Sequence, residues 1–159
     1  MTMPCEDEGL ALPPRSWDDG SASVTPDQLK AVIVDDDEMM RRLVRSALTG
    51  LGFTQIHAAE HGAAGLALAE REMPDIIIAD YNMPGMHGLD LVKAVREKEA
   101  LDRTVIIMLS AADEHDVIEG ARVLGADTFM VKPFERADLK RLIETLYHRF
   151  NCATIKWPA

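Results

Sequence analysis

The chain has 159 residues, 47% of them apolar, and its 17 basic against 27 acidic side chains give a formal net charge of −10. This length suits one domain with a real core, and the acidic balance excludes nucleic acid as the default partner, because phosphate contacts need a basic face. No apolar run approaches the roughly 20 residues of a membrane span, and the start lacks a signal peptide. Cys5 and Cys152 have no motif spacing, which favours reduced thiols. We therefore expect a cytoplasmic protein with no membrane insertion and no direct DNA binding.

The first 28 residues differ in composition and hydrophobic pattern from the rest of the chain. They are rich in Pro, Ser, Gly and acidic side chains and show no hydrophobic periodicity. Such a composition is typical of a solvated segment without a core of its own. We predict a largely disordered acidic extension over residues 1–28, one domain over 29–150 and a short tail over 151–159.

From Lys30 onward, short apolar runs alternate with amphipathic segments. The apolar runs have the length of buried strands and lie at residues 30–34, 53–58, 75–79, 104–109 and 127–131. The helical patterns follow them at residues 39–51, 61–73, 88–99, 113–124 and 135–150. Five β-α repeats of this kind predict an α/β fold, a doubly wound parallel sheet with five helices covering both faces.

Two of the predicted helices carry clear apolar stripes. In the first helix we assign to the core Met40, Leu43, Val44, Ala47, Leu48 and Leu51, and Gly50 and Gly52 can end it. In the last helix the stripe consists of Leu139, Leu142, Ile143, Leu146 and Phe150. We interpret this second stripe as core rather than as a cofactor site.

Polar residues stand where several predicted strands end. Strand one ends in Asp35, Asp36 and Asp37, strand three in Asp80, strand four in Ser110 and strand five in Lys132. Ligands of open parallel sheets bind outside the carboxyl ends of the strands. If strands one and three are neighbours, their acids meet. Strand two ends without acid at residues 57–59, which suits a sheet edge.

Three carboxylates in one crevice repel each other, and a divalent cation removes the conflict. Oxygen ligation favours Mg²⁺ over Zn²⁺, which prefers His and Cys, and the five histidines are scattered. Beside such an ion, Lys132 and the Ser110 hydroxyl make a site for a dianionic phosphoryl group. Asp80 can then attack phosphorus in line.

Four motifs together resemble the receiver domain of two-component response regulators. They are VIVDDD, IIIADYNMPGMHG, IIMLSA and FMVKPF, each of which closes a predicted strand, and the resemblance covers about residues 30–150. It implies a flavodoxin-like fold with strand order 2-1-3-4-5. The type that the chain resembles is the stand-alone chemotaxis regulator.

The resemblance also implies roles for the matching residues. Asp80 would be the phosphoacceptor. Asp36 would bind Mg²⁺ directly, Asp35 would bind it through water, and Asn82 would lend its backbone carbonyl. Ser110 would bond a phosphoryl oxygen.

On strand five and after it, Lys132 would pair with the phosphoryl group and precede a cis bond to Pro133. Phe129 would be the aromatic residue whose rotamer follows Ser110. The partners implied are a sensor histidine kinase or a histidine phosphotransfer protein, and a downstream protein target. The target would bind the face made by the fourth predicted helix (113–124), the fifth strand (127–131) and the fifth helix (135–150). Monomer and phosphorylation-dependent homodimer both fit. The protein would not be an enzyme in the usual sense, but it would assist its own phosphorylation and autodephosphorylation.

Several alternatives remain open. The chain could be a phosphorelay intermediate or a phosphate sink. A phosphatase of the haloacid-dehalogenase type also uses Asp and Mg²⁺, but Asp80-Tyr81-Asn82 lacks its second acid. A flavin module would need a Ser/Thr/Gly-rich loop in place of DDDEMM. Among single residues, Asp37 and Glu38 suit a helix start, Phe129 could be core, and Met39 either faces a kinase or is a chance exposed apolar side chain.

Overall fold

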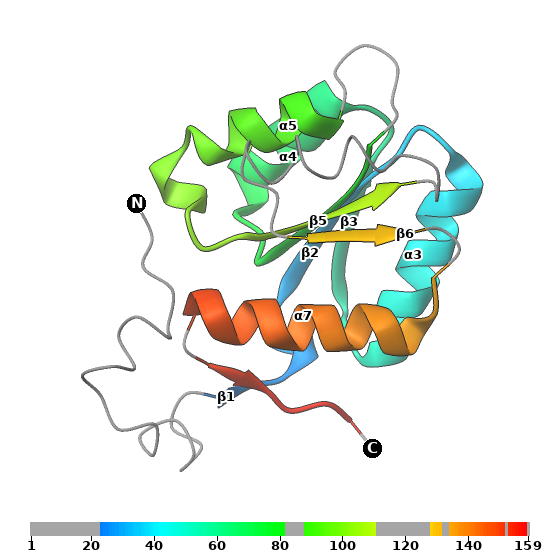
Figure 1. The fold of residues 1–159 in the computed structure, drawn as a ribbon, viewed down its shortest axis with the longest axis vertical. Coiled ribbons are helices and arrows are strands. Elements are labelled where there is room, and N and C mark those ends of the chain that lie inside the picture. Colours follow the sequence, from blue (N-terminus) through cyan, green and yellow to red (C-terminus); the bar gives the residue numbers. More distant parts are fainter. Residues whose placement is uncertain (1–22, 82–87, 111–127, 132–133, 152, 159) are drawn as a thin grey trace.

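The computed structural model describes residues 23–81, 88–110, 128–131, 134–151 and 153–158, drawn as coloured ribbon in Figure 1. Within these ranges the chain forms one parallel sheet between two layers of helices, together with a two-stranded sheet made by the segments nearest the two termini. None of the helices in the described part of the chain has the length and apolar character needed to cross a membrane.

Five parallel strands form the central sheet. They are β2 (Lys30–Val34), β3 (Gln55–Ala59), β4 (Ile76–Asp80), β5 (Val105–Ser110) and β6 (Thr128–Val131). Their order is β3-β2-β4-β5-β6, which confirms the predicted order 2-1-3-4-5. The strand that ends without acid, β3, lies at an edge, and β2 and β4 are neighbours, as their acids require.

Helices cover both faces of this sheet. They are α3 (Glu38–Leu51), α4 (Gly62–Glu72), α5 (Gly88–Arg96) and α7 (Arg136–Asn151), and short 3₁₀ turns η1 (Pro26–Gln28) and η2 (Glu99–Leu101) lie in the connections. In Figure 1, α4 and α5 lie on one side of the strands and α3 and α7 on the other. The predicted helix over residues 113–124 lies outside the described residues.

The alternation of side chains along each strand explains the two helical layers. Ala31 and Ile33 of β2 belong to the apolar cluster under α3 and α7, whereas Val32 and Val34 belong to the cluster under α4 and α5. Successive side chains of a strand point to opposite faces. Both faces are covered, so these strands read as continuous apolar runs rather than as alternating ones.

The ends of α3 follow from two residues. The Asp37 carboxylate accepts a hydrogen bond of 3.0 Å from the Met39 N–H at the helix start, which is ordinary N-capping. Gly52 ends the helix with φ 110°, a left-handed conformation that glycine adopts readily. The placement of Leu43 in the core is wrong: it is 53% exposed, because it lies about 100° around the helix from buried Val44.

The last helix packs as its stripe predicts. Leu139, Ile143 and Leu146 are buried, and Leu142 and Phe150 pack against the same core cluster. Tyr147 is also buried, although it was not assigned to the stripe.

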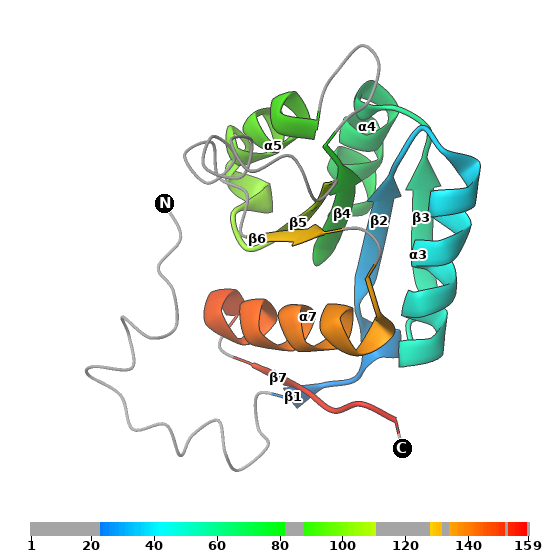
Figure 2. The same ribbon diagram turned by 45° about the vertical axis from the view of Figure 1, so that its right-hand side comes forward.

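The first and the last strand of the described residues pair with each other. β1 (Ser23–Val24) runs parallel to β7 (Thr154–Ile155), with Ser23 beside Thr154 and Val24 beside Ile155. We placed residues 23–28 in the extension and 151–159 in a tail, but Val24, Ile155 and Trp157 join a core cluster of the domain. Figure 2 shows the two short strands running below α7. Residues 1–22 lie outside the described part.

Candidate functional site

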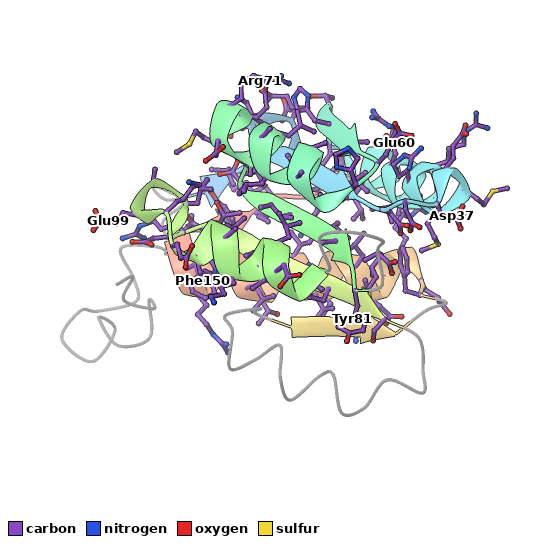
Figure 3. The ribbon with its side chains drawn as sticks, turned by 90° about the horizontal axis from the view of Figure 1, so that it is seen from above. Asp37, Glu60, Arg71, Tyr81, Glu99 and Phe150 are labelled. Carbon is purple, nitrogen blue, oxygen red and sulfur yellow. The ribbon has the colours of Figure 1, made fainter. Side chains whose placement is uncertain are left out.

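The register of the sheet places the predicted polar residues side by side at the carboxyl ends of the strands. Val34 of β2 is the partner of Ala79 in β4, so Asp35 and Asp80 are the next residues of neighbouring strands. Asp80 is in turn the partner of Leu109, and Ser110 follows it. Figure 3 looks at the molecule from above, onto these strand ends, with Asp37 and Tyr81 labelled after β2 and β4.

Three carboxylates meet at the carboxyl ends of β2 and β4. Oxygens of Asp35, Asp36 and Asp80 lie within 4.8 Å of one another. Asp35 and Asp80 are only 2% and 5% exposed, while Asp36 is exposed to solvent. The structure therefore brings together three of the four acids that end these two apolar runs, whereas the fourth, Asp37, caps α3.

The turn after β2 holds Asp35 in place. Its N–H donates to the Ala59 carbonyl over 3.1 Å, and its Oδ1 accepts a 2.9 Å bond from the Asp37 N–H. Arg41 Nη1 donates to the Asp35 carbonyl at 2.6 Å. Sequence reasoning missed Arg41, because a polar residue one turn into a helix differs in no pattern from a solvated arginine.

The turn after β4 depends on Gly88. The Tyr81 N–H donates to the Leu109 carbonyl over 2.9 Å, and the Gly88 N–H donates to the Tyr81 carbonyl over 3.0 Å. A Cβ on residue 88 would stand 2.5 Å from the Asp80 carbonyl oxygen and 2.9 Å from the Tyr81 Cα. Gly88 thus lets α5 begin directly against the backbone that carries Asp80. Gly88 belongs to the motif IIIADYNMPGMHG, but the motif alone did not predict this role.

Ser110 supplies a buried hydroxyl beside the acids. It is 1% exposed, and its Oγ has no hydrogen-bond partner in the described part of the protein. A buried hydroxyl without a partner is costly, which favours a ligand that supplies one. Asn82, Lys132 and the side chain of Phe129 lie outside the described residues. Val131, which precedes Lys132, is the register partner of Ser110.

The donor set has the character of a hard-cation site. Three clustered carboxylates repel one another unless a positive charge stands between them, and all three offer oxygen. Oxygen ligands with one member open to water suit Mg²⁺. The residues present therefore fit the ion that the sequence led us to expect.

Comparison with known proteins agrees with this geometry. The response regulator receiver domain family matches residues 31–144. The chain is 38% identical over 123 residues to the chemotaxis protein CheY of Pseudomonas aeruginosa, covering 77% of this chain and 99% of that protein. It is 36% identical over 121 residues to CheY-3 of Vibrio cholerae, with 76% and 93% covered.

Solved structures show the same likeness. Chemotaxis protein CheY4 of Vibrio cholerae superposes with a TM-score of 0.69 at 32% identity, over 74% of this chain and 98% of that one. The receiver domain of a Pseudomonas aeruginosa sensor histidine kinase, solved with a magnesium ion in its active-site cleft, gives a TM-score of 0.69 at 25% identity, over 75% and 97%. The chain therefore belongs to the response regulator receiver domain family of two-component signalling. Within that family, its similarity is to receivers of the CheY type, with the flavodoxin-like fold that the motifs imply.

Proposed function

We propose that this protein accepts a phosphoryl group on Asp80 from a phosphohistidine of a sensor kinase or histidine phosphotransfer protein, in a Mg²⁺-dependent reaction, and thereby changes its protein contacts. The observation that carries the proposal is the cluster of Asp35, Asp36 and Asp80, with the buried Ser110 hydroxyl on the next strand of the sheet. Membership of the receiver family supports the same chemistry.

Four groups of this chain would hold the ion: the carboxylates of Asp36 and Asp80, Asp35 through water, and the backbone carbonyl of Asn82. When bound, Mg²⁺ offsets negative charge on the phosphoryl oxygens. Without that positive charge a dianionic group would meet three carboxylates, so we expect no transfer in its absence.

The chain's own residues carry the transfer step. A carboxylate oxygen of Asp80 attacks phosphorus in line and forms a P–O bond, while the P–N bond to the donor imidazole breaks and its electron pair returns to nitrogen. The released imidazole keeps or gains a proton from solvent. Lys132 pairs with the phosphoryl oxygens, and Ser110 donates its hydroxyl hydrogen to one of them.

The Ser110 hydroxyl links the chemistry to a change of shape. A phosphoryl group on Asp80 gives Ser110 Oγ a hydrogen-bond acceptor, so the phosphorylated protein favours the conformation in which the two are close. In our proposal Phe129 follows Ser110, and the surface of residues 113–124, β6 and α7 changes its affinity for a downstream protein.

The donor's docking surface lies, in our proposal, on α3 beside the acids. Met39 and Leu43 are 65% and 53% exposed and stand four residues apart on one helix. A shallow hollow of about 270 Å³ lies at Glu38, Met39 and Arg42. We expect Met39→Ser/Leu43→Ser to slow phosphoryl transfer from a phosphorylated kinase, but not from a small-molecule donor. If the variant lost the same fraction of the wild-type rate with both donors, or lost none with the kinase, this surface would not be the docking site.

The test of the proposed reaction is phosphoryl uptake measured by intact mass. Incubation with Mg²⁺ and a small phosphoryl donor should add one phosphoryl group to the wild-type protein and none after chelation of the ion. Asp80→Asn should take up none, and Asp36→Asn should need far more Mg²⁺. Asp37→Asn is the matched control, because Asp37 caps α3 and is not one of the three clustered acids. Undiminished uptake by Asp80→Asn would refute the proposal.

A further inference from the structure

A groove lies between α3 and α7, away from the clustered acids. It has a volume of about 510 Å³ and is lined by the last turn of α3, the first turns of α7 and the segment after β7, through Gly50, Leu51, Glu135, Arg136, Ala137, Lys140, Trp157 and Pro158. We call it the α3–α7 groove. Trp157 and Pro158 lie beyond residues 31–144, which match the receiver family. The groove thus depends in part on residues outside the stretch that matches the family.

Trp157 is held at the groove by three contacts. Its Nε1 donates to Glu144 Oε2 over 3.1 Å, its ring stands 6.3 Å from that of Phe53, and Lys140 Nζ lies 5.5 Å from its centroid. The polar edge of the indole is therefore already bonded within the protein. What it adds to the groove is mainly apolar and aromatic surface, next to Leu51 and Pro158.

The charge of the groove is opposite to that of the protein. Its lining contains Arg136 and Lys140 against Glu135 alone, a sum of +2 − 1 = +1, in a chain of net charge −10. An occupant that suits both features carries acidic side chains next to apolar ones. Groove and occupant would then attract each other in the way that complementary charges favour association.

The chain itself contains such a segment within reach. Residues 1–22 hold five acids and one arginine, a net charge of −4, and Glu6, Asp7 and Glu8 are followed closely by Leu10 and Leu12. Ser23 pairs with Thr154, three residues before Trp157, or about 10 Å along a strand. The eleven residues from Leu12 to Ser23 span up to about 36 Å.

From these observations we propose that residues 5–12 dock in the α3–α7 groove of the same molecule. Glu6, Asp7 and Glu8 face Arg136 and Lys140, and Leu10 and Leu12 contact the apolar part of the groove. Exposed ion pairs are weak and screened by salt. Attachment through Ser23, however, gives the segment an effective concentration on the order of 1 mM, so a millimolar contact is populated about half of the time.

The experiment uses Trp157 as the reporter. The chain has two tryptophans, Trp17 and Trp157, so the full-length Trp17→Phe protein fluoresces from the groove alone. Acrylamide quenching of Trp157 is measured in that protein and in its Glu6→Gln/Asp7→Asn/Glu8→Gln derivative, at low and high salt. We expect quenching up to about twofold stronger in the neutralised derivative at low salt, and no difference at high salt.

Two further variants in the Trp17→Phe protein locate the contact. Arg136→Gln removes a cation of the groove and should raise quenching as tail neutralisation does. Arg141→Gln is the matched control, because Arg141 is an exposed arginine on the same helix that does not line the groove; it should leave quenching unchanged. Quenching that is equal with and without the tail acids overturns the proposal. Protection of Trp157 that grows with protein concentration also overturns it, because the occupant would then be a second copy.

Discussion

Asp75 directly precedes β4, at the end of the strand opposite to the clustered acids, and its charge acts on Tyr147 of α7. Burial raises the pKa of the Asp75 carboxyl, although the hydrogen bond from the Lys30 N–H and the charge of Lys30 act against it. Burial, together with the nearby Asp75 charge, raises the pKa of Tyr147 to about 12. Both groups are thus more easily kept neutral in the folded protein than in the unfolded chain.

The shift of Tyr147 predicts a loss of stability at alkaline pH. The unfolded tyrosine ionises near its ordinary pKa of 10.0, whereas the folded one ionises near 12. The stabilisation is therefore complete below pH 10 and is lost as the pH rises to 12, on the order of 2 kcal/mol in all. Tyr147→Phe should remove this part of the pH dependence of the free energy of unfolding, measured by urea denaturation. An unchanged alkaline slope in the variant would contradict the assignment.

At the scale of single residues, the site was predicted where polar side chains interrupt apolar runs. Asp35, Asp80 and Ser110 stand out because each follows or ends a strand that is otherwise apolar. The contacts of Arg41 with Asp35 and of Gly88 with Asp80 were not predicted. They depend on how the turns fold in space, and a single arginine or glycine in the first turn of a helix carries no periodic signal.

At the scale of elements, the period of the hydrophobic pattern predicted the type and order of the helices and strands well, but their boundaries less well. The helix expected over 88–99 ends at Arg96 and is followed by the 3₁₀ turn η2, because the pattern continues through a turn that also buries Leu101. Leu43 shows the same limit. Spacing alone does not fix whether a residue at the border of an apolar stripe is buried or exposed, because tertiary packing decides it.

The contact between α4 and β2 gives a prediction at this scale. A Cβ on Gly65 would lie 2.5 Å and 2.9 Å from the two methyl carbons of Val34, in the middle of the core. Gly65→Ala should therefore lower the free energy of unfolding, because overpacking costs about 1–3 kcal/mol and exceeds the gain in helix propensity of about 1 kcal/mol.

Gly50→Ala is the matched control. Gly50 also lies in a helix, but the three heavy atoms nearest to a Cβ there all belong to the Arg136 side chain, which is flexible and can move away. This variant should be neutral or more stable by up to about 1 kcal/mol in urea denaturation. If both variants changed stability in the same direction and to the same extent, close packing at Gly65 would be the wrong explanation.

At the scale of the whole molecule, the pairing of β1 with β7 was not predicted. Strands of two residues are too short to show a period of two, and their partner lies at the other end of the chain. In the structure they join Val24, Ile155 and Trp157 to the core cluster of α3 and α7, and the Lys156 N–H donates to the Val24 carbonyl over 2.7 Å. Both ends of the described chain are thus tied beneath one helix.

Ile155→Ala tests whether this pairing stabilises the domain. Ile155 is 4% exposed, and truncation of a buried isoleucine costs about 2–5 kcal/mol. Thermal and urea denaturation should show a loss of that order, whereas exposed Lys156→Ala should change stability by less than about 0.5 kcal/mol. A loss no larger for Ile155→Ala than for Lys156→Ala would mean that the terminal strands add nothing to the core.

In the proposed reaction, Asp80 is the one side chain that carries the phosphoryl group. The most direct measurement is to reduce the phosphorylated protein with borohydride, which converts an acyl phosphate of aspartate to homoserine, and to map the product by peptide mass spectrometry. We expect homoserine at position 80 alone, and only after reaction in the presence of Mg²⁺. Homoserine at Asp35 or Asp36, or a phosphoryl group that survives on serine or histidine with position 80 unmodified, would contradict it.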